Sequence, residues 1–485
     1  MNERKIVAGV TALIAIIYAG IMIGWHLYNP WEHLTVQAPG ADNRPEGLTR
    51  TASDVHIGEF FMRYDATDSQ DRLANEGEPS PFSGQWSNFR GKDLNNIINV
   101  REHIIIYSDD YPVIWSAEMG EGYAAPVIYN GRAYLLDYHE PLSSDALRCF
   151  SIETGQELWR RWYRVPMKRN HGFSRTVPAI GDDYIITIGP EGHVMCCDPI
   201  TGDLRWSLDM KKHFNTKIPE WYTGQCPLVD NHTLILAPAG DEVLLAGLDC
   251  LTGEILWTTP NTPGYDMSHS SVMPMTLSAK RTYVYFGKGG VCGVSADADD
   301  CGTLLWETGK WSPNVIAPSP LQLSPNRIFL TAGYGAGGAL LQIDRSGNQW
   351  KATIIDQYKP NEGLSSEQQT PILYNNMIIG ILPAGGGGNR FKIACYDPSN
   401  LRSPFWTSAA DERFGFGPFL VINNHLFALK EDGELYVYEI QHQSMKLLKK
   451  QRIMDGIDAW GPLAYADGML MVRDAHHVKC LKITQ

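Results

Sequence analysis

The strongest constraint in this sequence is an internal repeat with a period of about 45 residues. A small or polar residue, a proline and a short apolar run recur eight times, at positions 44–52 residues apart. Each copy continues into a turn rich in Asn, Asp or Gly and then into an alternating β-rich run. The eight prolines are Pro126, Pro178, Pro227, Pro274, Pro320, Pro371, Pro418 and Pro462.

A second element, a Thr-Gly turn followed by a tryptophan, recurs in step with the first. Complete copies begin at Thr154, Thr201 and Thr252, and weaker ones begin at Cys301 and Ser346. Together the two elements describe four short strands per repeat, which is one blade of a β-propeller. We expect the tryptophans of the last strands to pack between neighbouring sheets and hold the ring: Trp115, Trp159, Trp206, Trp257, Trp306, Trp350 and Trp406.

The ends of the repeat region predict how the ring closes. The last repeat stops at Gln485 without a Thr-Gly-Trp strand, whereas Val113-Ile114-Trp115-Ser116 supplies one such strand before the first complete repeat. Pairing the two would leave no open edge at the seam. The sequence therefore predicts an all-β fold over residues 112–485, an eight-bladed β-propeller of four-stranded antiparallel blades closed by an N-terminal strand.

The N-terminus differs from the repeats. Arg4 and Lys5 precede residues 6–24, which carry no charge and are followed by aromatic residues. Such a run approaches the ~20 apolar residues that cross a hydrocarbon core. We expect a cytoplasmic tip at 1–5 and one transmembrane signal-anchor helix at 6–28, with everything after it outside the cytoplasm. A cleaved signal peptide is the alternative, although the apolar run is long for one and residues 17–19 make a poor cleavage site.

This topology predicts a single-pass protein of the bacterial inner membrane with its propeller in the periplasm. Residues 29–85, in which Pro, Gly, Asp, Glu and Ser dominate, are expected to form an extracytoplasmic tether in which residues 57–62 dock as a short strand or helix. Residues 86–111 are a lead-in segment. The net charge of 41 − 54 = −13 argues against nucleic acid as a partner. Nine cysteines leave at least one unpaired in a monomer, and the pairing of the others stays open.

The Thr-Gly-x-x-x-Trp element resembles the pyrroloquinoline quinone (PQQ) repeat. That repeat is shared by quinoprotein alcohol dehydrogenases and by cofactor-free propellers such as the BamB-like outer-membrane assembly factors. The segment Trp86-Ser87-Asn88-Phe89-Arg90-Gly91 is also similar to the opening of bacterial PQQ-binding-like β-propeller repeat proteins. The resemblance covers most of the chain and implies the fold, but function resides in sites that vary on a shared fold.

The loops that lead into the innermost strands of a propeller converge on its central channel, so the residues before each proline are expected to line an axial pocket. Arg for a carboxylate, Thr, Ser and Gln for carbonyl groups and Trp for stacking would suit an anionic planar ligand. A ring of hydrated polar groups around a water-filled channel is the simpler interpretation, and we favour it. The candidates are Tyr123, Ser174, Arg175, Thr223, Gln225, His269, Ser270, Asn314, Glu367, Gln368, Arg413, Asp458 and Trp460.

Two functions follow from these observations, and whether the chain is an enzyme stays open. The first is a scaffold without bound cofactor that engages a protein partner in or near the membrane. The second, implied by the resemblance, is a quinoprotein alcohol or sugar dehydrogenase with PQQ and Ca²⁺ in the axial pocket and with Asp458 or Glu367 as candidate general base. A polysaccharide-binding module rests only on the aromatic content and is weaker.

Two features bear on the enzyme hypothesis. The calcium-binding Asn and carboxylate pair of those enzymes has no matching motif in this sequence. Their disulfide between adjacent cysteines invites comparison with Cys196-Cys197, but Cys196 occupies a regular strand position and neighbouring strand residues point to opposite faces. No metal site is predicted either, because His476 and His477 also lie on a strand and should diverge.

Overall fold

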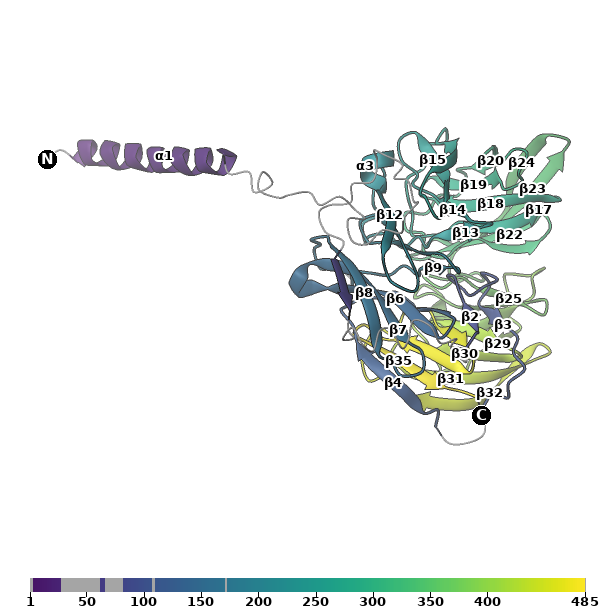
Figure 1. The fold of residues 1–485 in the computed structure, drawn as a ribbon. Coiled ribbons are helices and arrows are strands. Elements are labelled where there is room, and N and C mark those ends of the chain that lie inside the picture. Colours follow the sequence, from purple (N-terminus) through teal and green to yellow (C-terminus); the bar gives the residue numbers. More distant parts are fainter. Residues whose placement is uncertain (1–2, 28–61, 66–81, 107–109, 171, 485) are drawn as a thin grey trace. The chain divides into compact units, whose positions relative to one another are not determined.

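The computed structural model describes residues 3–27, 62–65, 82–106, 110–170 and 172–484 (Figure 1). The N-terminal helix α1 spans Glu3–Leu27, and the large apolar side chains described on it are exposed, among them Leu13, Ile16 and Ile21. A search of the described residues finds no helix with both the length and the apolar character that a membrane crossing requires. The predicted helix is present, and its role as an anchor stays a prediction. Most of the predicted tether, including residues 57–61, lies outside the described residues.

The rest of the chain forms eight antiparallel blades, as the repeat predicts. In blades 1 to 4 the strands run from the innermost outward as β5 (Val127–Tyr129), β6 (Arg132–His139), β7 (Ser144–Ser151), β8 (Glu157–Arg164); β9 (Ala179–Ile180), β10 (Ile185–Ile188), β11 (His193–Cys197), β12 (Leu204–Asp209); β13 (Leu228–Asp230), β14 (Thr233–Leu236), β15 (Val243–Asp249), β16 (Ile255–Pro260); and β17 (Met273–Leu277), β18 (Lys280–Gly287), β19 (Gly290–Ser295), β20 (Leu304–Thr308). In blades 5 to 8 they are β21 (Leu321–Ser324), β22 (Arg327–Ala332), β23 (Gly337–Ser346), β24 (Gln349–Tyr358); β25 (Ile372–Tyr374), β26 (Met377–Ile381), β27 (Ile393–Tyr396), β28 (Trp406–Thr407); β29 (Phe419–Ile422), β30 (His425–Leu429), β31 (Glu434–Gln441), β32 (Ser444–Arg452); and β33 (Ala464–Ala466), β34 (Met469–Arg473), β35 (His477–Lys482), β4 (Val113–Glu118). The described residues also form three short helical turns: α3 (Met210–Phe214), η2 (Glu140–Leu142) and η3 (Gly387–Asn389).

Blade 8 closes the ring with an N-terminal strand. β4 pairs antiparallel with the C-terminal strand β35, so that Trp115 lies opposite Cys480. The indole Nε1 of Trp115 then donates to the carbonyl of Ile152 in blade 1 at 2.7 Å. The predicted closure is confirmed, because strands from both ends of the repeat region share one sheet.

Three strands outside the repeats extend two of the blades. β1 (Met62–Asp65), which falls within the predicted tether, pairs with the outer strand β8 of blade 1. β2 (Gln85–Trp86) pairs with the innermost strand β5 of the same blade. β3 (Ile97–Ile98) pairs in parallel with β29 in blade 7. No repeat motif marks these three strands in the sequence.

A chain of hydrogen bonds around the axis explains why a small or polar residue begins the repeat. In blades 2 to 6 the backbone N–H before one innermost strand donates to the side chain of the equivalent residue in the next blade. The donor–acceptor pairs are Val177 to Cys226 Sγ at 3.3 Å, Cys226 to Ser271 Oγ at 2.9 Å, Ser271 to Ser319 Oγ at 3.2 Å and Ser319 to Thr370 Oγ1 at 2.8 Å. In blade 4 the equivalent pair is thus Ser271-Val272, and Pro274 lies within β17. The motif assigned to blade 4 from Pro274 is therefore shifted by two residues.

The Thr-Gly turn receives the tryptophan of the preceding blade. Gly202 has a φ of +72°, which favours glycine, and a Cβ placed there would lie 2.7 Å from the Trp159 ring. Gly155, Gly253 and Gly302 lie in the same way against Trp115, Trp206 and Trp257. The later copies differ: Trp306 is buried, Trp350 lies under the Arg345 guanidinium at 4.9 Å, and Trp406 meets Tyr438 of blade 7 edge to face at 5.9 Å.

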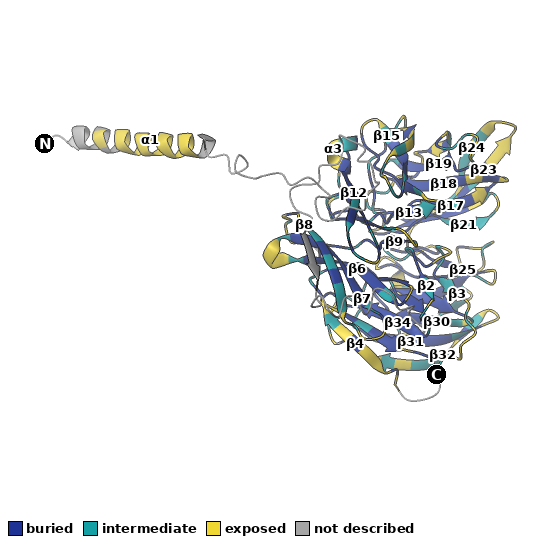
Figure 2. Cartoon of the chain, in the orientation of Figure 1, coloured by how far each residue is buried: buried dark blue, intermediate teal, exposed yellow. Residues whose placement is uncertain are grey.

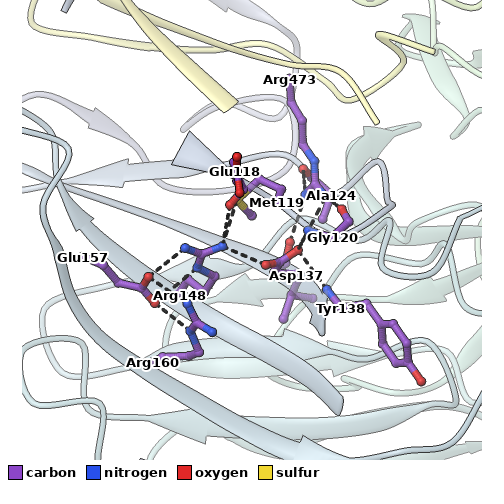
Figure 3. A network of polar contacts seen from close by, with 11 residues as sticks. Glu118, Met119, Gly120, Ala124, Asp137, Tyr138, Arg148, Glu157, Arg160 and Arg473 are labelled. Carbon is purple, nitrogen blue, oxygen red and sulfur yellow. Dashed lines mark hydrogen bonds and ion pairs between the residues drawn. The ribbon is translucent and has the colours of Figure 1, made fainter. Parts of the chain in front are cut away.

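A buried charge network joins blades 8 and 1 (Figure 3). Arg473 at the end of β34 is fully buried and donates to the carbonyls of Ala124, Leu136 and Gly120, each at 3.0 Å. Asp137 accepts from Arg148 at 2.8 Å and from the Gly120 N–H at 2.7 Å. Arg148 reaches Glu157 at 2.7 Å. The network holds the two blades together at the seam. Its buried charges have partners, without which the cost of removing them from water would not be offset.

All nine cysteines are free thiols in the structure. Cys196 and Cys197 are both fully buried, but they pack into different hydrophobic clusters on the two faces of β11. The alternation of strand side chains accounts for this separation. The Gly-rich segments 333–336 and 382–392 connect strands within blades 5 and 6, as their lack of a following helix predicts.

Candidate functional site

The lead-in segment crosses the central channel. Its first part runs from β2 in blade 1 to β3 in blade 7. Between them, the buried Arg90 donates to the carbonyls of Thr370 at 3.2 Å and Pro371 at 3.1 Å, where blade 6 begins. Phe89 lines one cavity on the axis, and Arg90 with residues 93–95 lines another of about 280 Å³. Residues of this segment therefore contribute to the walls of both cavities, and the water-filled channel stays a prediction.

The first cavity, which we call the axial pocket, has a volume of about 130 Å³. Its walls come mainly from the loops that precede the innermost strands, as expected for a propeller. The lining residues are Phe89, Tyr123, Arg175, Val177, Trp221, Gly224, Cys226, His269, Ser271, Val315, Ala317, Tyr334, Gln368, Gln369, Trp460 and Pro462.

Five residues proposed from the sequence line the axial pocket together: Tyr123, Arg175, His269, Gln368 and Trp460. Among the aromatic and amide residues of the lining, sequence reasoning missed Phe89, Trp221, Tyr334 and Gln369. Trp221 lies further from Pro227, and Gln369 lies closer to Pro371, than the residues proposed in those two loops. Phe89 and Tyr334 come from the lead-in segment and from a connection between β22 and β23, for which the repeat gives no signal.

The other candidates lie outside the lining. Thr223 is fully buried, and Gln225 exchanges hydrogen bonds with the backbone of Ala237 at 2.9 and 3.0 Å, which is a structural role. Arg413 donates to the carbonyls of Arg390 and Gly388. Asn314 is exposed.

Neither candidate general base lines the pocket. Glu367 accepts from the backbone N–H groups of Tyr334 at 3.2 Å and Ala384 at 3.1 Å, so both of its oxygens brace loops. Asp458 stands in the loop that leads to Trp460, with a φ of +56°. Burial raises the pKa of Tyr123 to about 12, and the charge of Asp458 adds to this shift while that of Arg175 opposes it. Asp458 thus lies close enough to act on the pocket wall electrostatically.

Arg175 dominates the charge of the axial pocket. Burial lowers its pKa to about 10, so the guanidinium stays protonated at neutral pH. Its carbon Cζ lies 5.9 Å from the centre of the Tyr123 ring, and the side chain donates to the Gly172 carbonyl at 3.3 Å. Burial and the nearby Arg175 charge lower the pKa of His269 to about 4, so this imidazole is neutral at the same pH.

A buried carboxylate supports this wall from behind. Asp145 is fully buried on β7 and accepts hydrogen bonds from the hydroxyl of Ser174 and, at 3.1 Å, from that of Tyr163. The Ser174 carbonyl in turn accepts from the N–H groups of Tyr123 at 2.8 Å and Ala124 at 3.1 Å. Asp145 therefore anchors the residue next to Arg175 and, through it, the loop that carries Tyr123.

We predict that Asp145 makes the propeller less stable as the pH rises through neutrality. Burial raises its pKa to about 7, above the value near 4 of an unfolded chain. Between these two pKa values the folded state binds a proton that the unfolded state does not. The stability that this proton confers is lost as the pH rises through about 7. Asparagine does not titrate, so the unfolding free energy of Asp145→Asn relative to that of wild type should rise by about 1 kcal/mol from pH 6 to pH 8. Chemical unfolding at both pH values measures this gain, and parallel pH profiles would contradict the assignment.

One cluster of acidic side chains in the described part of the chain is close enough to hold a metal: Asp297, Asp299 and Asp300. The Lys280 Nζ lies among them, 3.1 Å from Asp297, 3.8 Å from Asp299 and 2.7 Å from Asp300. An ammonium group already occupies the position where a cation would neutralise these carboxylates. We therefore assign the cluster a structural role in the connection between β19 and β20.

Residues 143–368 match the family model described as "Outer membrane protein assembly factor BamB". This match confirms the predicted resemblance to the PQQ-repeat propellers. No curated protein sequence matches the chain significantly.

Solved PQQ-type propellers share the fold. A europium-containing methanol dehydrogenase aligns with a TM-score of 0.55 at 13% identity, covering 83% of this chain and 91% of that one. The quinohemoprotein alcohol dehydrogenase from Comamonas testosteroni aligns with a TM-score of 0.54 at 11% identity, covering 86% and 82%. BamB from Moraxella catarrhalis gives a TM-score of 0.49 at 13% identity, covering 77% of this chain and 100% of that one. At such identities the first two likenesses establish the propeller fold alone.

The donor set of the axial pocket does not fit PQQ with Ca²⁺. Calcium is held by six to eight oxygen ligands, usually with carboxylates among them. The described lining of the axial pocket contains no Asp or Glu, and Glu367 is committed to two backbone N–H groups. The described lining of this pocket therefore offers no carboxylate to hold Ca²⁺.

Proposed function

We propose that the chain is a protein-binding scaffold, a membrane-anchored propeller outside the cytoplasm that works without a bound cofactor. The observation that carries this proposal is the strand β1 on the outer edge of blade 1. β1 pairs with β8 over four residues, from Met62 opposite Trp162 to Asp65 opposite Trp159. An outer blade edge of this propeller thus accepts an additional extended segment, and strand addition is a common way to bind a partner protein.

Blade 5 offers the longest such edge. Its outer strand β24 has ten residues, and no described strand pairs with its outer side. Ile355 on this strand is 46% exposed, and Lys351 and Gln357 are exposed on either side of it (Figure 2). A long outer strand with an exposed apolar side chain is a template for pairing with another chain. We therefore assign the partner's extended segment to the edge of β24.

Three further observations support the proposal. The description of the matching family, an outer-membrane assembly factor, is that of a protein that works with other proteins. The donor set of the axial pocket supports the absence of PQQ with Ca²⁺, and with it the non-enzymatic reading. The net charge of −13 argues against nucleic acid as a partner.

The N-terminal helix supports the anchored location. α1 spans 25 residues, and residues 6–24 carry no charge. The described apolar side chains on it are exposed on all sides, as on a helix that faces lipid. Arg4 and Lys5 lie in the first turn of α1, and this charge bias favours a propeller on the far side of the membrane from the cytoplasm, in the periplasm of a bacterial inner membrane.

Photo-crosslinking in intact cells tests the scaffold. A benzophenone amino acid replaces Ile355 on β24 in the full chain, and the matched control replaces Leu142, which is 51% exposed on the turn η2 and belongs to no blade edge. We expect one adduct of defined mass from position 355, recovered with alkali-washed membranes, and none from position 142. Identical adducts at both positions, or none at 355, would exclude β24 as the docking edge. Release of the chain by the alkali wash would exclude the anchor.

A further inference from the structure

Aromatic rings form two groups in the lining of the axial pocket. In one, Tyr123 and Trp460 lie 4.8 Å apart between ring centres. In the other, Trp221 stacks on Tyr334 at 5.4 Å and on His269 at 6.2 Å, with interplanar angles of 28° and 21°. Flat aromatic surfaces of this kind favour a planar ring as ligand, through offset stacking or edge contacts.

The charge of the lining selects an anion. Arg175 is its one permanent cation, and no Asp or Glu is among the described residues that line the pocket. A planar guanidinium donates two parallel hydrogen bonds to a carboxylate, which is the geometry that distinguishes Arg from a point charge. The neutral amides of Gln368 and Gln369 belong to the same lining, and the Gln369 Nε2 donates to the carbonyls of Phe416 at 3.4 Å and Trp460 at 3.1 Å.

Two polar atoms in the pocket wall still need partners. The Trp460 Nε1 and the His269 Nδ1 are inaccessible to solvent and make no hydrogen bond within the described structure. Buried polar atoms without partners are rare in native proteins, and each calls for an explanation. Both residues line the axial pocket through other atoms, so a ligand oxygen would reach the Trp460 Nε1 only if the indole shifted towards the pocket.

The size of the pocket suits a ligand with one ring. Its volume of about 130 Å³ is close to that of cavities that hold a single benzene ring. PQQ has three fused rings and three carboxylates, and its charge exceeds what one arginine neutralises.

We propose that the axial pocket binds a small planar aromatic monocarboxylate, with the ring between the two aromatic groups and the carboxylate on Arg175. This site goes beyond the scaffold function, which does not depend on it. The ligand class also differs from the cofactor of the PQQ-repeat dehydrogenases.

Calorimetric titration of the full chain in dodecyl maltoside tests the proposal. Benzoate is the probe, and benzamide, which has the same shape without the charge, is its neutral counterpart. We expect saturable binding of benzoate at least tenfold tighter than that of benzamide. Arg175→Gln should weaken benzoate binding at least tenfold and leave benzamide binding unchanged, which also shows that the variant pocket is intact. If that variant does not fold, Trp221→Ala replaces it and should weaken both ligands.

Arg413→Gln is the matched control, because Arg413 is the arginine expected in the pocket from sequence that the structure places outside its lining. It should bind benzoate like wild type. Equal losses in the two arginine variants, no saturation with benzoate, or displacement of benzoate by PQQ in a Ca²⁺-dependent manner would overturn the proposal. Crosslinking at position 355 is expected to be the same in Arg175→Gln, so the pocket and the scaffold can fail separately.

Discussion

Arg473→Met is expected to lower the free energy of unfolding by about 3 kcal/mol or more. The side chain is fully buried, and its guanidinium donates to three backbone carbonyls from two segments that meet at the seam of the ring. Methionine has a similar length but no donor, so those carbonyls would lose their partner in a site that water does not reach. Asp137 would keep only Arg148 as a cationic partner (Figure 3). Urea unfolding followed by tryptophan fluorescence measures the loss.

Arg452→Met provides the control for this prediction. Arg452 is about half exposed on the outer strand of blade 7 and donates to the Asp432 carbonyl. Because water replaces such a contact, the variant should stay within about 0.5 kcal/mol of wild type. Equal losses in the two variants would mean that the seam network does not hold the ring closed. Arg473→Lys should fall between them, since an ammonium group cannot reach all three carbonyls in the guanidinium geometry.

The repeat made the blades predictable because each of its residue types has a physical task. Glycine allows the positive φ of the turn and leaves room for the tryptophan of the preceding blade, as at Gly155 and Trp115. The Ser, Cys or Thr before the innermost strand accepts a hydrogen bond from the blade before it. Closure by residues 113–118 followed from counting strands. The same reasoning failed at blade 4, where Val272 stands at the position expected for the proline. The motif of that blade was assigned from the nearby Pro274 instead.

The candidate site was predictable only as far as the repeat reaches. Tyr123, Arg175 and Trp460 were found because each precedes an innermost strand at a regular position. The lead-in segment has no second copy in the chain, so nothing in the pattern indicated that Phe89 lines the axial pocket. Residue type also does not tell a residue that lines the pocket from one with a structural role. Arg175 lines the pocket, whereas Arg413 donates to backbone carbonyls of a neighbouring connection.

Gly202→Ala is expected to cost about 3 kcal/mol of unfolding free energy. Part of the cost, about 1 kcal/mol, comes from placing a side chain at a φ of +72°. The rest comes from the new Cβ, which would lie 2.7 Å from the Trp159 ring and would push the ring or the turn out of its packed position. Gly347→Ala is the matched control, because its φ is +59° but nothing lies within 4 Å of its Cβ. It should lose only the backbone part.

A double variant separates the two contributions at Gly202. In a Trp159→Ala background the ring is gone, so Gly202→Ala should cost about 1 kcal/mol there, as Gly347→Ala does in the wild type. The interaction energy from this cycle measures how strongly the tryptophan of one blade depends on the turn of the next. If Gly202→Ala costs the same with and without Trp159, the glycine is needed only for the conformation of its own turn. The repeated pairing of the Thr-Gly and Trp elements would then reflect local turn geometry rather than docking between blades.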